Sequence, residues 1–380
     1  MEKSKVYFSD MRALPGTNLQ EKLKKLIKKA GIGEIDFNGK FTAIKIHFGE
    51  PGNLAFLRPN WAKTVVDTVK ELGGKPFLTD CNTLYVGRRK NALEHLDSAY
   101  ENGYSPFSTG CHVIIADGLK GTDETLVPIE GEFVKEAKIG TAIMDADVFI
   151  SLSHFKGHEA TGFGGAIKNI GMGCGSRAGK MEQHYSGKPK AKKEKCRGCM
   201  ICTKNCAHGA ISFDENRKAE IDHTKCVGCG RCIGACPFDV IKPSNGSAED
   251  LLNRKMAEYA WAVVKDRPQF HISLVIDVSP YCDCHAENDV AIIPDVGMFA
   301  SFDPVALDQA CADACNKQEA MLGSLLDERI QACACGCGHD HEHEHDHFHM
   351  VSPNTNWKVC LEHAEKIGLG QREYELIEVK

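Results

Sequence analysis

The sequence predicts an α/β fold: a mostly parallel sheet with helices on both faces, interrupted by a small α+β module. Two observations support this. Strand-length apolar runs alternate with amphipathic segments before residue 154 and after residue 248, and cysteines crowd the stretch between them. A hydrophobic content of 42% is ample for a buried core. We therefore expect one α/β domain in two parts, residues 1–188 and 246–380, around a module inserted at residues 189–245.

In the first part of the α/β domain, expected strands alternate regularly with expected helices. We expect strands at residues 5–11, 41–49, 75–80, 112–117 and 147–153, and helices at 18–30, 60–72, 89–102 and 134–144. In the second strand Ile44, Ile46 and Phe48 alternate with Lys45 and His47. One face of that strand is therefore apolar, and the other presents an amine and an imidazole.

The second part continues the same alternation. We expect helices at residues 248–265, 304–316 and 357–367, and strands at 270–278, 290–293 and 374–379. Asp303 is a good N-cap residue and Pro304 suits a first helical turn, so together they mark a helix start. We expect this helix to run to about residue 316, with continuation toward residue 329 as the alternative. Strands separated by helices favour a parallel sheet.

The inserted module carries the strongest chemical pattern. Residues 196–206 and 226–236 each read C-x2-C-x2-C-x3-C, and Pro237 follows the second run. This spacing is typical of a bacterial two-cluster ferredoxin, in which the fourth cysteine of each run binds the other cluster. We assign Cys196, Cys199, Cys202 and Cys236 to one [4Fe-4S] cluster, and Cys226, Cys229, Cys232 and Cys206 to the other.

Two other uses of these cysteines fit less well. A zinc site needs four ligands rather than eight at one repeated interval. Disulfides suit small secreted chains, which this is not. The module departs from the ferredoxin pattern at Ala207, where a proline is expected after Cys206, but this removes no ligand.

The charge and hydropathy of the chain limit the classes of partner that it can bind. The net charge is −6 and basic residues are scattered, apart from a run at 188–195, so we expect no nucleic-acid binding. No apolar run approaches the roughly 20 residues that cross a membrane, and the first residues lack a signal-peptide core. We expect a cytoplasmic, reducing location and a redox partner protein, a ferredoxin or a reductase, which the basic run could help to dock.

Residues 154–180 are rich in glycine and charge. Eight glycines lie among these 27 residues, so we expect neither an ordinary helix nor a strand. Backbone N–H groups beside cationic side chains suit a small anionic substrate. We take Lys168, Asn169 and Cys174 as candidate binding residues. The alternative is a loop whose glycines only permit close packing beneath the module.

The candidate catalytic residues follow two strands: His154, Lys156 and His158 come after one, and Cys282 and Cys284 after another. Lys45 with His47, and Asp80 with Cys81, lie at the ends of two more strands. Ligands of open α/β sheets bind at the carboxyl ends of strands, so we expect one shared crevice. There the two sulfurs could hold a metal or meet a substrate, with a histidine as proton donor. Alternatively, such cysteines are small core residues and Lys45 and His47 face solvent.

Composition changes abruptly at residues 333–349, where three cysteines and six histidines mix with acidic residues. We expect a flexible surface tract that binds metal. An insertion with no metal role is an equal alternative.

Several segments together resemble the DUF362 family of iron–sulfur proteins. They are IKIHFGEPG (44–52), FLTDCNTLYVGRR (77–89), the glycine-rich residues 151–180, CDC (282–284), SFDPVALDQA (301–310) and EKIGLGQREYELIEV (365–379). The resemblance implies an α/β domain interrupted by a two-cluster ferredoxin insert, mostly in anaerobic organisms. It leaves the reaction open.

The functional hypothesis is that electrons pass through two [4Fe-4S] clusters to or from a site in the α/β domain, as in an iron–sulfur oxidoreductase of unknown substrate. One alternative is a non-enzymatic electron carrier whose large domain only docks partners. Another is a metal-handling protein centred on residues 333–349. The sequence leaves the oligomeric state open.

Overall fold

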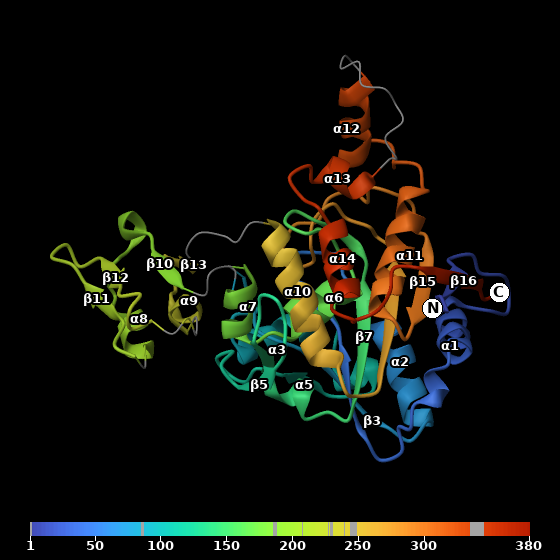
Figure 1. Ribbon diagram of the computed structural model, residues 1–380, viewed down its shortest axis with the longest axis horizontal. Helices are drawn as coiled ribbons and strands as arrows, with labels where there is room; N and C mark the ends of the chain where they lie inside the picture. The colour runs from blue at the N-terminus through green and yellow to red at the C-terminus, as the bar shows by residue number, and fades with distance from the viewer. Residues whose placement is uncertain are drawn as a thin grey trace.

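The computed structural model describes residues 2–84, 87–184, 188–206, 208–226, 228, 231–238, 240–243, 249–334 and 346–380. An 8-stranded sheet forms the centre of the α/β domain (Figure 1). Its strands, in spatial order, are β16 (Tyr374–Glu378), β1 (Ser4–Asp10), β15 (Gly297–Ser301), β14 (Gln269–Val275), β7 (Val148–His154), β2 (Phe41–Lys45), β3 (Lys75–Asp80) and β4 (Val113–Ile115). Only β15 in this sheet runs antiparallel to its neighbours, so the predicted mostly parallel sheet is confirmed.

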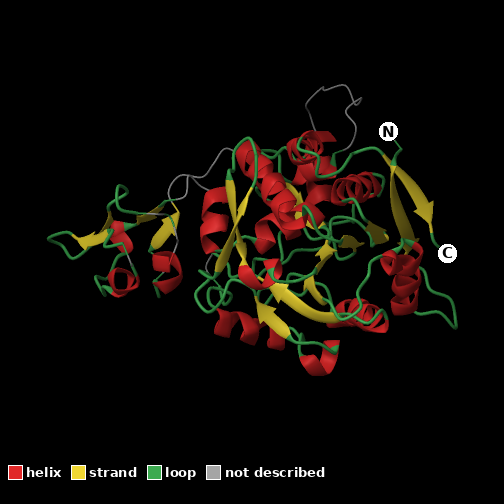
Figure 2. Ribbon diagram, turned by 60° about the horizontal axis from the view of Figure 1, so that its bottom comes forward, coloured by secondary structure: helices red, strands yellow, loops and turns green. Residues whose placement is uncertain are grey.

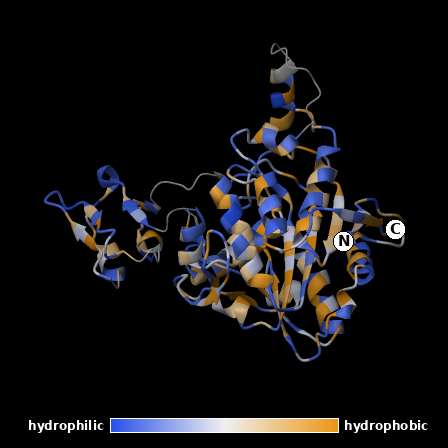
Figure 3. Ribbon diagram, in the orientation of Figure 1, coloured by the Kyte–Doolittle hydropathy of each residue, from blue (hydrophilic) through white to orange (hydrophobic). Residues whose placement is uncertain are grey.

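Helices cover both faces of the sheet (Figure 2). One face carries α1 (Leu19–Lys29), α2 (Pro59–Glu71) and α3 (Ala92–Glu101); the other carries α6 (Ala166–Cys174), α10 (Glu249–Val264), α11 (Pro304–Asn316) and α14 (Lys358–Lys366). Strand residues alternate between two cores, as Ile44 and Ile150 do on one side and Ala43 and Phe149 on the other. Figure 3 shows the apolar colour concentrated on the central strands.

Shorter elements complete the chain. They are η1 (Ile32–Glu34), α4 (Pro106–Thr109), β5 (Glu124–Pro128), β6 (Glu136–Gly140), α5 (Thr141–Met144), β8 (Lys156–His158), β9 (Gly162–Gly164), α7 (Arg177–His184), α12 (Leu325–Ala334) and α13 (His347–Val351). Among helices in the described ranges, none is both long and apolar enough to cross a bilayer.

The inserted module forms a separate small body, at the left of Figure 1. It comprises β10 (Pro189–Ala191), η2 (Lys193–Lys195), α8 (Ile201–Asn205), β11 (Ile211–Phe213), β12 (Ala219–Ile221), α9 (Arg231–Ala235) and β13 (Ile241–Pro243). Antiparallel pairing of β10 with β13 brings its first and last strands together. The chain therefore enters and leaves the module at one place, between α7 and α10.

The glycine-rich residues 154–180 form regular structure, so the expectation of neither helix nor strand was wrong. They build β8, β9, α6 and α7. A Cβ at Gly171 would lie 2.1 Å from the carbonyl oxygen of Met256, and one at Gly179 would lie 2.4 Å from that of Lys138. These glycines let α6 and α7 approach neighbouring backbone more closely than any other residue could.

Three further expectations need correction. Residues 136–140, expected to be helical, pair as a strand with β5, because tertiary pairing overrides local periodicity. Residues 290–293 form no strand, and the fully buried run 297–301 forms β15 instead. The helix that Asp303 caps was correctly placed and ends at Asn316 as expected; the alternative of a continuation toward residue 329 is wrong, because α12 is a separate helix.

The cysteine- and histidine-rich tract is also shorter than expected. Helix α12 includes residue 333, while residues 335–345 lie outside the described ranges. At the other end His347 and Phe348 are buried at 4% and 0% exposure. The Asp346 carboxylate accepts hydrogen bonds from the backbone of His349 and from Trp357 Nε1. His347 and Phe348 therefore belong to the core, and the surface tract ends before Asp346, whose carboxylate is held by these hydrogen bonds.

Candidate functional site

A cavity of about 310 Å³ lies at the carboxyl edge of the large sheet. The predicted candidates that line it are His154, Lys156, His158, Lys168, Asn169 and Cys284. The strand-end residues Lys45, His47, Asp80 and Cys81 line it too, rather than facing solvent. The structure thus brings the ends of β2, β3 and β7 and the loop after β14 to one crevice.

A buried ion pair forms the floor of this cavity. Lys45 Nζ lies 3.0 Å from Asp80 Oδ1, and both side chains are nearly inaccessible. Burial by itself would raise the pKa of Asp80, but the Lys45 ammonium holds that pKa well below its usual range. Asn169 accepts a 2.8 Å hydrogen bond from Lys45 Nζ and donates to the backbone carbonyls of Lys45 and Leu152. This amide therefore ties α6 to the ends of β2 and β7.

An arginine that the sequence reasoning missed anchors one wall. Arg89 Nε donates to Glu50 Oε2 at 2.7 Å, and Arg89 Nη1 lies 2.9 Å from His47 Nε2. Burial and then the Arg89 charge lower the pKa of His47 well below its usual value. His47 is therefore neutral, and its Nδ1 accepts a 3.0 Å hydrogen bond from the backbone N–H of Gly49.

His154 holds the loop that carries the cysteines. Its Nδ1 lies 2.9 Å from both carboxylate oxygens of Asp283, and its Nε2 lies 2.8 Å from the carbonyl oxygen of Ile276. Both ring nitrogens are thus engaged within the protein. The Asp283 pKa is about 2, because His154 and Lys156 outweigh the opposing effect of burial. The ring of His154, which the sequence offered as a catalytic candidate, therefore ties β7 to the loop that carries the cysteines.

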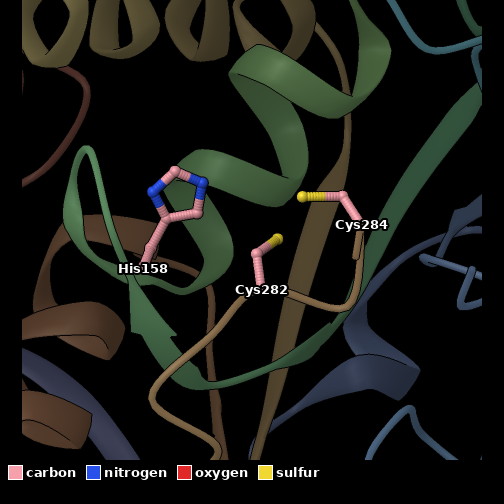
Figure 4. Close-up of side chains that lie close together, drawn as sticks. All are labelled: His158, Cys282 and Cys284. Carbon is pink, nitrogen blue, oxygen red and sulfur yellow. The ribbon is translucent and has the colours of Figure 1, made fainter. Parts of the chain in front are cut away.

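His158, Cys282 and Cys284 come together on one side of the cavity (Figure 4). One nitrogen and the two sulfurs all lie within 4.8 Å of one another. Lys168 Nζ donates a hydrogen bond to Cys282 Sγ at 3.2 Å. A hydrogen bond from Cys284 lowers the pKa of Cys282 well below its usual value against the effect of burial, and Lys168, Lys156 and His158 lower it further. The same bond and burial raise the pKa of Cys284, so the two sulfurs share one proton.

This trio has the spacing of a metal site but not its hydrogen bonding. A metal-binding imidazole normally donates a hydrogen bond from its second nitrogen. His158 Nδ1 instead accepts hydrogen bonds from the backbone N–H groups of Ala160 and Thr161, at 3.0 and 3.1 Å. Its proton therefore sits on Nε2, the nitrogen facing the sulfurs in Figure 4. With the Lys168 amine alongside, the site fits a hydrogen-bonded thiolate better than a metal, which was one of the two roles that the sequence left open for Cys282 and Cys284.

Cys174 is not part of the cavity lining. It is fully buried, and burial raises its pKa to about 12. Its backbone carbonyl accepts a hydrogen bond from Cys81 Sγ at 3.3 Å. Of the three candidate binding residues, only Lys168 and Asn169 reach the cavity.

The cavity lies at the base of the inserted module. His184, at the end of α7, and Leu252, in the first turn of α10, both line it. These two helices directly precede and follow the module. Leu84 and Met181 of the α/β domain also pack with Cys196, Cys202, Cys232 and Cys236 of the module in one hydrophobic cluster.

The module's cysteines line two smaller cavities. Cys196, Cys199, Cys202 and Cys236 line one; Cys206, Cys226 and Cys232 line the other, and Cys229 lies outside the described residues. Backbone N–H groups of Ala219 and Ala210 donate to Cys196 Sγ and Cys206 Sγ, both at 3.4 Å. Such bonds stabilise thiolates, so these side chains fit metal-cluster ligation.

Residues 42–313 match the family described as a domain of unknown function, DUF362. The chain belongs to this family. The match spans most of the α/β domain together with the module, and it confirms the resemblance seen in the sequence motifs.

Curated relatives of this DUF362 protein cover only part of it. A segment of 51 residues is 47% identical to the indolepyruvate oxidoreductase subunit IorA of Thermococcus kodakarensis, covering 13% of this chain and 8% of that one. Another of 58 residues is 40% identical to the thiosulfate reductase electron transfer subunit PhsB of Salmonella typhi, covering 14% and 30%. The lactate racemase apoprotein of Thermoanaerobacterium thermosaccharolyticum aligns over 72% of this chain and 51% of its own, with 10% identity and a TM-score of 0.37.

Sequence reasoning missed several residues of the DUF362 cavity: Arg89, Glu159, Lys180, His184 and His285. Arg89, Glu159 and Lys180 lie within the motifs that carry the family resemblance, which is the signal that could have found them. Glu159 accepts a 2.8 Å hydrogen bond from His285 Nε2. His158 and His285 hold the Glu159 pKa at about 2 against burial.

Proposed function

We propose that the chain is an iron–sulfur redox enzyme that carries electrons through two [4Fe-4S] clusters to or from the cavity at the sheet edge. The observation that carries this proposal is the position of the module. Its entry helix α7 contributes Lys180 and His184 to the cavity lining, and its exit helix α10 contributes Leu252. A module mounted there is well placed to exchange electrons with a bound ligand.

The cysteine arrangement supports two clusters of the ferredoxin type. Cys236 shares a cavity with the first cysteine run, and Cys206 shares one with the second. This exchange of fourth ligands is the two-cluster ferredoxin pattern. Each cluster, when bound, would take up or release one electron at a time. The relatives named as oxidoreductase or electron transfer subunits agree with such a role.

The cavity itself suits a small anionic substrate. Lys156 presents a buried amine to it, Lys168 presents a half-buried one, and neutral His47 adds a polar side chain to the wall. Low water access strengthens such charge interactions. A ferredoxin or a reductase would serve as the external redox partner.

Anaerobic isolation followed by metal and sulfide analysis tests the proposal. The loaded protein should hold about eight iron and about eight acid-labile sulfide, the sum for two [4Fe-4S] clusters. Cys236→Ser should perturb the same electron paramagnetic resonance signal as Cys199→Ser. Cys206→Ser should perturb the other signal, the one that Cys232→Ser changes.

Cys311→Ser is the matched control, because Cys311 is a fully buried cysteine of α11 outside the module. It should leave both signals and the iron content unchanged. Protein that carries stoichiometric zinc and no labile sulfide would refute the proposal. Clusters that reduce normally while no anion binds the cavity would favour the simple electron carrier.

A further inference from the structure

Cys282 and Cys284 form a pair with unequal access to the cavity. Cys282 is fully buried, whereas Cys284 is partly exposed and lines the cavity. Figure 4 shows both sulfurs on the same side of their loop, beside the His158 ring. Lys168 lies 3.2 Å from the inner sulfur. One sulfur therefore meets a ligand while the other stays in a fixed, cation-supported position behind it.

Other buried cysteines lack these features. Cys311 and Cys315 lie one turn apart on α11, both fully buried within the apolar core. Burial raises the pKa of both thiols well above the usual value, which makes them unreactive. They provide an internal reference within the same polypeptide.

We propose that Cys282 and Cys284 are a redox-active dithiol that closes to a disulfide when it reduces a ligand in the cavity. The proposal deepens the proposed function, because it names the group that would hold two electrons at the cavity end of the path. The thiol chemistry itself needs no cluster, so the two proposals can fail separately.

The reaction balances with a disulfide as the oxidant. Cys284 passes its proton to the Cys282 thiolate and attacks one sulfur of the external disulfide, whose S–S bond breaks and releases a thiolate. Cys282 then attacks the mixed disulfide at Cys284 and gives its proton to the second leaving sulfur. The protein pair loses two electrons and one proton, and the external disulfide becomes one thiolate and one thiol. Two electrons and one proton, with one electron from each reduced cluster, restore the starting state.

Two neighbours prepare this chemistry. The Lys168 ammonium stabilises the negative charge that the two sulfurs share. His158 points its protonated Nε2 toward the same sulfurs, because its Nδ1 is occupied by backbone N–H groups. Both are positioning residues here, and both oppose binding of a cation.

The test uses the full chain with the aromatic disulfide dithiodipyridine as probe, under anaerobic conditions. After brief reaction the protein is denatured in a thiol-blocking reagent, digested and analysed by fragment-ion mass spectrometry. The expected product is a Cys282–Cys284 disulfide, while Cys311 and Cys315 in the same digest carry the blocking group. A pyridine adduct that stays on Cys284 without closing, or blocked thiols at both positions, would overturn the proposal.

Lys168→Met tests the role of the ammonium. The rate of disulfide closure at neutral pH should fall roughly tenfold, the change in thiolate fraction for one pKa unit, and its pH midpoint should rise. Lys63→Met, at an exposed position on α2, is the control and should leave rate and midpoint unchanged. An unchanged pH midpoint in Lys168→Met would contradict the assigned role.

Iron and sulfide are measured on the same samples. Closure of the disulfide in protein that cannot be loaded with clusters would sink the proposed function and leave this inference standing. Fully loaded clusters without formation of the Cys282–Cys284 disulfide would overturn this inference and leave the proposed function standing. If the protein holds stoichiometric zinc, and both thiols react only after a chelator removes it, the pair is a metal site rather than a redox-active dithiol.

Discussion

The module and the cavity differ in how far apart in the chain their chemical groups lie. The cysteines of the module fall within residues 196–236 at repeated short intervals. The cavity draws its side chains from Lys45 to His285, contributed by at least six elements and loops. Closely spaced ligands leave a pattern that can be read directly. Side chains that a sheet brings together appear in the sequence only as single residues at the ends of separate strands. Whether they meet depends on the order of the strands in the sheet.

The largest effect is expected at the buried ion pair of Lys45 and Asp80 beneath the cavity. Lys45→Met leaves the Asp80 carboxylate without its 3.0 Å partner in a site with almost no water access. We expect the free energy of unfolding of the α/β domain to fall by about 3–5 kcal/mol. Denaturant titration followed by tryptophan fluorescence measures this.

Lys63→Met supplies the matched comparison, because Lys63 pairs with Asp67 at 2.8 Å but both side chains are nearly half exposed. Lys63→Met should lower the free energy of unfolding by less than about 1 kcal/mol. Iron content per folded chain should match the parent in both variants. An equal loss of unfolding free energy in the two variants would mean that water reaches the Lys45–Asp80 pair more freely than its burial indicates.

The next test concerns a carboxyl group that joins two distant parts of the cavity domain. Asp308 on α11 accepts hydrogen bonds from the backbone N–H groups of Ala166 and Ile167, at 2.6 and 2.9 Å. Burial raises its pKa from 3.8 to about 7. The folded state therefore favours the protonated acid, and this contribution to stability is complete below about pH 4. It is lost as the pH rises through about 7, because the unfolded chain ionises first.

Asp308→Asn should remove this pH dependence. Between about pH 4 and 7 the parent should lose up to roughly 1.4 kcal/mol per pH unit relative to the variant. Urea unfolding at several pH values gives the comparison. Parallel curves for the two proteins would show that Asp308 ionises normally in the fold.

Glycine packing gives an effect of intermediate size. Gly171→Ala places a Cβ 2.1 Å from the backbone carbonyl oxygen of Met256, which cannot move without shifting α10. We expect a loss of about 1–3 kcal/mol in unfolding free energy. Gly33→Ala is the control, since nothing lies within 4 Å of its added Cβ, and it should change stability by less than about 0.5 kcal/mol. A neutral Gly171→Ala would show that α6 and α10 can separate freely.

The smallest effect is expected for residues 335–345. Their replacement by a short flexible linker should change the melting temperature by less than about 2 °C, because loop length costs little closure entropy. Cluster iron should not change, and uptake of zinc or nickel should fall. Extending the deletion through 349 removes buried Phe348 and should cost about 3–5 kcal/mol. Similar stability of the two deletions would contradict the revised boundary at Asp346.

Much of the fold could be predicted from local patterns. The strand at residues 75–80 and the cap at Asp303 were placed correctly, since alternation and capping act over a few residues. The strand β6 and its partner β5 were missed, because their pairing is decided by contact rather than by periodicity. The cavity edge could be inferred from topology, but His184, which lies outside the family motifs, could not be assigned to it.

By itself the sequence predicted which residues would bind metal clusters, where strands alternate with helices, and that an inserted module divides the α/β domain. Covalent spacing and short-range periodicity carry that information. Only the tertiary structure decided that His154 anchors a loop, that His158 presents a protonated nitrogen to two sulfurs, and that Asp308 meets a backbone N–H group 142 residues away. Each depends on which partner lies within about 3 Å in the folded chain, a distance that hydrogen bonding requires and that chain order does not encode.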